Sequence, residues 1–245
     1  MKRLDVFLVE NGYVKSRKVA QELIKSGGVL IGEKVAQKCG VMVNDGEDIK
    51  LIKDVCPYVS RAGLKLEGAC KIFNVNVFDK TVLDIGSSTG GFSDYCLKNG
   101  AKKVYCVDVG DGQLHESIKK DKRVVVYENT DIRTLTKNRL KDVNMVICDV
   151  SFISLSLISH KIAEFLNDGD EAVVLIKPQF ECGKDVAQKF RGVIKDPKIH
   201  KLVIDKVVQD FLAKGLKLQK VEKSCILGTQ GNVEFVALFK KMSLL

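Results

Sequence analysis

Four charged side chains, two carboxylates and two amines, flank apolar segments in a pattern that could activate a hydroxyl group. Asp149 and Lys177 come directly after apolar segments, and Glu234 comes directly before one. A hydroxyl is a weak nucleophile at neutral pH and needs a base that takes its proton in the transition state. Lysine can be that base when burial or a second amine lowers its pKa, whereas flanking carboxylates raise that pKa and hold the side chain in place. The sequence leaves open which influence prevails.

The second amine, Lys65, belongs to a helix that we predict over residues 60–73, with Ser60 as its cap. The predicted inward stripe consists of Ala62, Leu66, Ala69, Ile72 and Phe73. Lys65 falls on the same face at helical spacing. A lysine on an apolar stripe either extends from the edge of the core to solvent or is a placed functional amine, and both interpretations stay open.

A glycine-rich segment between residues 84 and 94 predicts a ligand-binding turn. An apolar strand precedes it and a helix over residues 92–99 follows it, so a strand, a turn and a helix succeed one another. Glycines allow a backbone to approach a ligand closely, and the helix amides then face that ligand. The spacing G-x-x-x-G-G differs from the dinucleotide pattern G-x-G-x-x-G, and no G-K-[ST] is present. The candidates here are Asp84, Gly86, Ser87, Ser88, Gly90, Gly91 and Phe92.

Acidic residues follow the next two predicted strands as well. Asp108 lies about 20 residues beyond the turn, the usual offset of an acid that binds ribose hydroxyls, and Asp131 could accept a hydrogen bond from an adenine amino group. Three acids at successive strand ends suit a cationic, adenosine-containing cofactor and would repel a pyrophosphate. S-adenosylmethionine fits this pattern, with Val109, Ile132 and Asp149 as further candidate contacts. The alternative is an ordinary glycine-rich turn with surface acids.

Apolar segments alternate with helical ones after residue 57, which is typical of a sheet covered on both faces. The predicted strands are 81–83, 103–107, 124–127, 145–148, 172–176, 216–221 and 235–239, and the further helices are 154–166 and 198–214. Residues 184–198 are predicted to be a long basic loop. The alternation implies a parallel sheet, and ligands bind at the carboxyl ends of such strands. The fold class is therefore α/β, with a Rossmann-like, seven-stranded sheet.

The first 56 residues predict a separate small α+β module with two short helices and a few short strands. Ten lysines and arginines stand against eight acids here, so an RNA-binding interpretation depends on local clustering rather than bulk charge. The candidate RNA contacts are Arg3, Lys15, Arg17, Lys18 and Lys25. A solvated basic helix face would have the same composition. We expect domains at 1–56 and 57–245, joined by a linker over residues 53–57.

Composition limits the compartment and the partners. The net charge of +9, from 40 Lys and Arg against 31 Asp and Glu, indicates a polyanionic partner. The eight cysteines include no C-x-x-C pair, which predicts reduced thiols of a cytoplasmic protein rather than disulfides or a metal site. Charges near the start and short apolar runs argue against a secretion signal, a membrane span or a membrane partner.

The first module resembles the RNA-binding domain of ribosomal protein S-four. The residues that carry this resemblance are Arg3-Leu4-Asp5, Ser16-Arg17, Ala20, Ile24-Lys25-Ser26-Gly27 and Val29. Across nearly its whole length the chain resembles the TlyA family of ribosomal RNA ribose 2′-O-methyltransferases, also named haemolysin A-like, in which such a domain is fused to an FtsJ-like methyltransferase. The carrying motifs are Tyr58 to Leu66, Asp84 to Asp94, Asp108-Val109-Gly110 with Gln113-Leu114, Cys148 to Leu155, Ile176 to Glu181 and Gly231 to Phe235.

The resemblance assigns a Lys-Asp-Lys-Glu tetrad to Lys65, Asp149, Lys177 and Glu234. It implies that Lys177 deprotonates a ribose hydroxyl, that S-adenosylmethionine is the cofactor, and that ribosomal RNA or a ribosomal subunit is the partner. Further basic candidates for RNA contact are Arg61, Lys184, Lys189 and Arg191. The chain starts directly at Arg3-Leu4-Asp5, like the short form of the family, which implies a cytidine of 23S rRNA rather than sites in both 23S and 16S.

Two alternatives come from other classes of protein. A haemolysin or pore-forming protein would need a secretion route and a spanning or amphipathic segment, and the sequence shows neither. A non-catalytic RNA-binding ribosome factor would not need a glycine turn or a lysine on an apolar stripe.

Overall fold

The computed structural model describes residues 1–52 and 56–243. The chain divides into two compact units, Met1–Pro57 and Tyr58–Leu245. Residues 53–55 of the predicted linker lie outside the described part. Among the described residues, no helix combines the length and the hydropathy that a membrane span requires.

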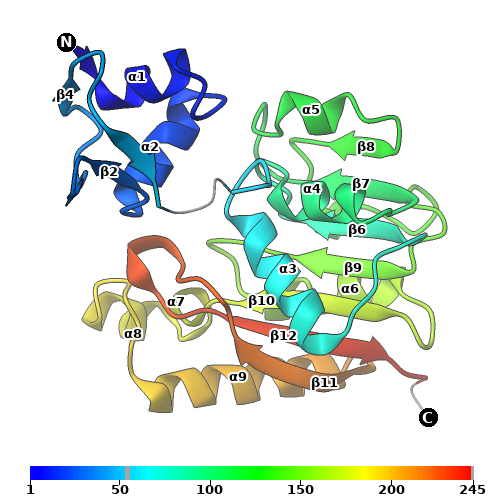
Figure 1. The fold of residues 1–245 in the computed structure, drawn as a ribbon. Helices are drawn as coiled ribbons and strands as arrows, with labels where there is room; N and C mark the ends of the chain where they lie inside the picture. Colours follow the sequence, from blue (N-terminus) through cyan, green and yellow to red (C-terminus); the bar gives the residue numbers. More distant parts are fainter. Residues whose placement is uncertain (53–55, 244–245) are drawn as a thin grey trace. The chain divides into compact units, whose positions relative to one another are not determined.

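The small unit is an α+β module with its own apolar core (Figure 1). Its helices are α1 (Leu4–Glu10) and α2 (Arg17–Lys25), and its strands are β1 (Lys2–Arg3), β2 (Val29–Ile31), β3 (Lys34–Val35), β4 (Met42–Val43) and β5 (Ile49–Leu51). Ser16 caps α2, because its hydroxyl accepts a hydrogen bond from the Val19 amide at 3.4 Å. Strand β1, which pairs with β4, was not predicted.

The large unit is built on a seven-stranded sheet in the order β11-β12-β10-β9-β6-β7-β8. The strands are β6 (Thr81–Ile85), β7 (Lys103–Val107), β8 (Val124–Tyr127), β9 (Met145–Cys148), β10 (Glu171–Ile176), β11 (Leu216–Lys223) and β12 (Phe235–Lys241). The helices are α3 (Ala62–Phe73), α4 (Gly91–Lys98), α5 (Glu116–Lys119), α6 (Ser159–Phe165), α7 (Pro178–Glu181), α8 (Lys184–Lys189) and α9 (Pro197–Leu212). The predicted Rossmann-like α/β class is confirmed.

Helices cover both faces of the central strands, and successive residues of a strand point to opposite faces. Val82 belongs to the core under α3 and α4, whereas its neighbour Leu83 belongs to the core under α6 and α9 (Figure 1). Burial on both faces explains why the central strands are nearly continuous apolar runs in the sequence.

The sheet is not parallel throughout, which corrects the expectation from the alternation. Strand β12 runs antiparallel to both of its neighbours, β10 and β11. Ile176 at the end of β10 pairs with Phe235 at the start of β12. Lys177 and Glu234 therefore lie next to each other at one edge, although one follows its strand and the other precedes its strand.

The predicted helix over residues 154–166 is interrupted, which is a second correction. A 3-10 turn, η2 (Leu155–Leu157), comes first, and α6 then begins at Ser159. The buried Glu181 carboxylate fixes this turn, since it accepts hydrogen bonds from the Ser154 hydroxyl at 2.6 Å and the Leu155 amide at 2.8 Å.

The predicted basic loop over residues 184–198 instead begins with the short helix α8. Gly183 precedes it with φ of 85°, and Arg191 and Gly192, just beyond its end, have φ of 50° and 75°.

Helix α3 also departs from prediction. It starts at Ala62 with Arg61 as its cap, and in the predicted inward stripe Ile72 is 50% exposed, while Cys70 is buried instead.

Candidate active site

The glycine-rich turn joins β6 to α4 at the carboxyl edge of the sheet. Gly86 has φ of 82°, and a Cβ atom there would lie 2.8 Å from the Asp149 carbonyl oxygen. Only glycine meets both conditions without strain. The turn is held on its other side by β7, since the amides of Gly86 and Ser87 donate to the Val107 carbonyl at 2.9 and 3.2 Å.

A cavity of about 570 Å³ lies beside this turn and is lined by residues that follow β6, β7, β8 and β9. Asp108 organises its wall: one carboxylate oxygen accepts from the Ser88 amide at 2.8 Å, and the other from the Gly110 amide at 2.7 Å. The predicted cofactor residues that line the cavity are Gly86, Ser88, Asp108, Val109, Asp131, Ile132 and Asp149. The predicted residues that do not line it are Asp84, Ser87, Gly90, Gly91 and Phe92.

Asp84 does not face the cavity. Its side chain is fully buried, and its carboxyl group accepts a hydrogen bond from the Ser93 hydroxyl of α4 at 2.6 Å. Burial is the largest cause that raises the pKa of Asp84 to about 7, and the nearby charges of Asp149 and Asp108 raise it further. This residue therefore anchors α4 to β6.

We expect Asp84→Asn to flatten the pH dependence of stability. An unfolded aspartate has a pKa of about 3.9, whereas that of Asp84 in the folded protein is about 7. Between these values the folded state binds more protons, so the free energy of unfolding falls as pH rises. Urea unfolding from pH 4.5 to 7.5 measures this slope, with the exposed Asp111→Asn as the control. A variant Asp84→Asn that loses as much stability as the wild type across this range would contradict the assignment.

Lys177 belongs to a polar cluster with Asp149 and Ser151, two residues that line the cavity. It follows β10, its neighbour Asp149 follows β9, and these two strands are paired in the sheet. The Lys177 ammonium lies 2.6 Å from the Asp149 carboxylate and donates to the Ser151 hydroxyl at 2.8 Å. Lys177 is 8% exposed. Asp149 also lines the cavity, so it connects the amine to the cavity wall.

The second amine is buried rather than extended to solvent. Lys65, on α3, lies 2.6 Å from the carboxylate of Glu234, and their side chains are 11% and 3% exposed. The antiparallel direction of β12 places Glu234 at the same edge as Lys177. The four residues of the predicted tetrad thus form two ion pairs at the ends of the adjacent strands β9, β10 and β12.

Three residues near the tetrad were missed. Ser151 holds Lys177, and Phe152 lies on the cavity wall with 91% of its surface exposed and φ of 65°. Gly228 is the third, because a Cβ atom there would overlap the Glu234 carboxylate. Ser151 and Phe152 stand in the motif that follows β9, so their positions were a usable signal. Gly228 stands in a connection with no motif.

We expect Gly228→Ala to lower the activity of this site by displacing Glu234 from Lys65. The added methyl group has no space unless the carboxylate moves, which would break the 2.6 Å ion pair. Single-turnover rates should fall, while cofactor affinity measured by calorimetry stays close to the wild type. Gly40→Ala is the matched control, since neither Gly40 nor Gly228 has a positive φ, and a Cβ atom at Gly40 would come no closer than 3.7 Å to its nearest neighbour, Arg3. Equal rates for Gly228→Ala and wild type would contradict this role.

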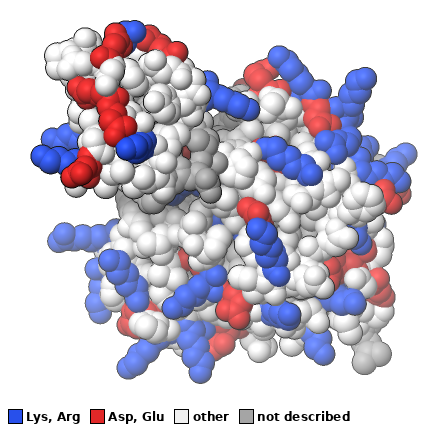
Figure 2. Space-filling view, in the orientation of Figure 1, with Lys and Arg blue, Asp and Glu red and all other residues white. Residues whose placement is uncertain are grey.

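The candidate RNA contacts divide into two groups. Arg3 and Arg17 lie 3.0 and 3.2 Å from the buried Asp5 carboxylate, and the Arg3 hydrogen bond is the largest cause that holds the pKa of Asp5 well below its usual range. Their first role is to neutralise that acid. The exposed candidates are Lys15, Lys18 and Lys25 in the small unit and Arg61, Lys184, Lys189 and Arg191 in the large one. Lysine and arginine side chains are spread over the visible face of the large unit (Figure 2).

Both units of the chain match known protein families. Residues 58–241 match the family described as FtsJ-like methyltransferase, and residues 2–49 match the S4 domain. The 16S/23S rRNA (cytidine-2′-O)-methyltransferase TlyA of Mycobacterium tuberculosis is 37% identical over 235 residues, which cover 95% of this chain and 87% of that protein. The 23S rRNA (cytidine-2′-O)-methyltransferase TlyA of Campylobacter jejuni is 38% identical over 205 residues, covering 82% and 77%.

A solved structure from Streptococcus thermophilus, named as a candidate haemolysin, is also similar. It is 37% identical with a TM-score of 0.78, covering 99% of this chain and 89% of that one. The family match spans the glycine turn, the cavity and all four tetrad residues. The chain therefore belongs to the FtsJ-like methyltransferase family, whose members use S-adenosylmethionine, and it carries an S4 domain in residues 2–49.

Proposed function

We propose that the protein transfers the methyl group of S-adenosylmethionine to the ribose 2′-hydroxyl of a cytidine in ribosomal RNA. The observation that carries this proposal is the buried Lys177 ammonium, held by Asp149 and Ser151, which both line the cavity. The amine is thus directly behind two residues of the cavity wall.

The cavity residues fit the cofactor. Three carboxylates line the cavity, Asp108, Asp131 and Asp149, and Arg133 beside them pairs with Asp131 at 2.6 Å, while Gly86 contributes no side chain. We assign Asp108 to the ribose hydroxyls and Asp131 and Ile132 to the adenine side of the cavity. When bound there, S-adenosylmethionine supplies a methyl carbon activated by a positively charged sulfur.

The chain's own residues then handle the proton. Lys177 in its neutral form takes the proton of the ribose hydroxyl at Nζ, so that the developing oxyanion can attack. Asp149 and Ser151 hold Nζ in place through their short contacts, and Asp149 stabilises the ammonium that forms. The buried ion pair of Lys65 and Glu234 links α3 to the start of β12, next to Lys177 at the end of β10.

Ribosomal RNA is the proposed substrate because the names of both TlyA relatives specify it, and 23S rRNA is common to the two names. The S4 domain would bind RNA phosphates through its exposed Lys15, Lys18 and Lys25, and the protein would act in the cytoplasm, where ribosomal RNA is found. Labelled S-adenosylmethionine incubated with separate ribosomal subunits tests this. Label in 23S rRNA alone is expected. Label in 16S rRNA, with or without label in 23S rRNA, or in neither, would contradict the 23S-only assignment.

We expect Phe152→Ala to weaken productive RNA binding. An aromatic side chain exposed on the cavity wall, with its ring centroid 5.0 Å from that of Phe180, offers a surface on which a base can stack. Loss of such a stack costs about 1–3 kcal/mol per base, which should raise KM for ribosomal subunits with unchanged cofactor affinity. Leu157→Ala, another exposed apolar side chain, is the control. An unchanged KM for Phe152→Ala would rule out the stacking role.

A further inference from the structure

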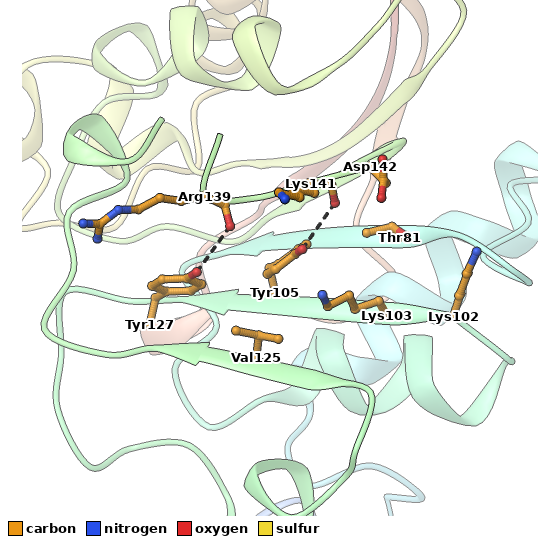
Figure 3. A pocket seen from close by; sticks show the side chains of 9 residues that line it. All are labelled: Thr81, Lys102, Lys103, Tyr105, Val125, Tyr127, Arg139, Lys141 and Asp142. Atoms are coloured by element: carbon orange, nitrogen blue, oxygen red, sulfur yellow. Dashed lines mark hydrogen bonds between the residues drawn. The ribbon is translucent and has the colours of Figure 1, made fainter. Parts of the chain in front are cut away.

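A second pocket lies on the face of the sheet that α6 and α9 cover elsewhere. The connection between β8 and β9 is described throughout, and it forms a 3-10 turn, η1 (Ile132–Thr134), but no α-helix. The sheet over β7 and β8 therefore lacks a helical cover, and the side chains of Val125 and Tyr127 stay partly exposed. The resulting pocket has a volume of about 560 Å³ (Figure 3).

Aromatic side chains form one wall of this pocket and basic side chains surround it. The hydroxyl groups of Tyr105 and Tyr127 donate to the backbone carbonyls of Lys141 and Arg139 at 3.3 and 3.4 Å, which fixes both rings. Figure 3 shows Arg139 at the Tyr127 end, and Lys102 and Lys103 at the other end. The pocket thus combines a fixed aromatic surface with cations at both ends.

The charge of the pocket is not neutralised within the described residues. None of the four cations, Lys102, Lys103, Arg139 and Lys141, forms an ion pair within residues 1–52 and 56–243, and Asp142 is the one acid among the lining residues. The Lys103 ammonium lies 4.6 Å from the centroid of the Tyr105 ring. Cations that track a backbone, next to aromatic rings that accept bases, are the combination that binds single-stranded nucleic acid.

We propose that this pocket binds a single-stranded segment of the RNA substrate, with phosphates at the four cations and a base against Tyr127. The pocket runs along β7 and β8 from Lys103, the first residue of β7, to Tyr127, the last residue of β8. None of its lining residues lines the cavity beside the glycine-rich turn, so the bound segment is distinct from the target nucleotide. The inference rests on the proposed function in that the ligand is RNA.

Neutralisation of two cations tests the phosphate contacts. The probe is a fluorescent, single-stranded RNA oligonucleotide, and its affinity for the full chain is measured by anisotropy over a range of salt concentrations. Lys103→Gln combined with Lys141→Gln should lower the slope of log affinity against log salt by roughly 0.7 per lost phosphate contact, about 1.4 in total. The matched control is Lys217→Gln with Lys220→Gln on exposed β11 positions. Equal slopes for the two pairs would overturn the proposal.

Two substitutions of Tyr127 test the base contact. Tyr127→Leu should weaken RNA binding by roughly 5- to 150-fold, whereas Tyr127→Phe keeps the ring and should bind like the wild type. Equal loss in both variants would overturn the stacking, since it would assign the effect to the hydroxyl bond with Arg139. If cytidine monophosphate binds as tightly as the oligonucleotide, the proposal that an extended RNA strand occupies the pocket is wrong.

Methylation of ribosomal subunits is measured in parallel so that the two proposals fail separately. If the pocket variants retain wild-type RNA affinity and wild-type methylation, the proposed RNA contact at this pocket is ruled out, while the proposed reaction still holds. If the wild-type protein binds RNA through the pocket but methylates neither subunit, the proposed reaction is ruled out instead.

Discussion

Replacement of Lys177 by alanine is expected to lower the single-turnover methylation rate by ~10²–10⁴, the usual contribution of a general base. The ammonium makes its short contacts with Asp149 and Ser151 rather than with Asp108, Asp131 or Ile132, the residues proposed to bind adenosine. Affinities for S-adenosylmethionine and for RNA should therefore change little, because the lost interaction is made in the transition state. Quenched single-turnover assays with saturating enzyme measure the rate directly.

Lys177→Arg separates a base from a structural cation. Arginine keeps the positive charge and can still pair with Asp149, but it does not release a proton near neutral pH. The arginine variant should be nearly as slow as the alanine variant if Lys177 is the base. Substantial activity in Lys177→Arg, with folding and cofactor binding verified, would leave Lys177 with an electrostatic role only.

Glu234→Ala is expected to destabilise the protein by about 3–5 kcal/mol, because it leaves the buried Lys65 ammonium without its partner. Both side chains are almost fully enclosed, and 2.6 Å separates the charged groups. The double variant Lys65→Met with Glu234→Leu replaces the pair by apolar side chains of similar size, and it should recover most of the lost stability. Its methylation rate should stay low, since the polar arrangement at the tetrad is absent.

Urea unfolding and single-turnover rates on the same preparations provide the comparison. Recovery of stability without recovery of activity assigns the pair a role in the reaction centre. Recovery of both would show that Lys65 and Glu234 serve folding alone, and the tetrad would then reduce to Asp149 and Lys177.

Much of the sheet could be predicted because its central strands are buried on both sides. The buried strands β7 and β9 match the predicted segments, and the partly buried edge strand β8 matches as well, since apolar runs bounded by polar or charged residues define their ends. The direction of β12 could not be predicted in this way. An apolar run looks the same in a parallel and an antiparallel strand, so the position of Glu234 beside Lys177 followed from the pairing of Ile176 with Phe235.

The end of strand β6 determines whether Asp84 belongs to the ligand-binding turn or to the core. The predicted strand ended at residue 83, which left Asp84 in the turn, whereas β6 continues to Ile85. Alternation along the longer strand directs Asp84 to the face covered by α4, where Ser93 binds it. The cavity residues that were predicted, such as Asp108 and Asp131, follow strands whose ends were located correctly.

The atom that receives the methyl group is the most direct test of the central claim. Ribosomal RNA methylated with labelled S-adenosylmethionine is hydrolysed in alkali, which cleaves every linkage that retains a free 2′-hydroxyl. The proposed reaction predicts that the label is recovered in a single alkali-resistant dinucleotide with cytidine at its 5′ position, and that Lys177→Ala abolishes it. Label recovered in mononucleotides would place the methyl group on a base and contradict the assignment of Lys177 to a ribose hydroxyl.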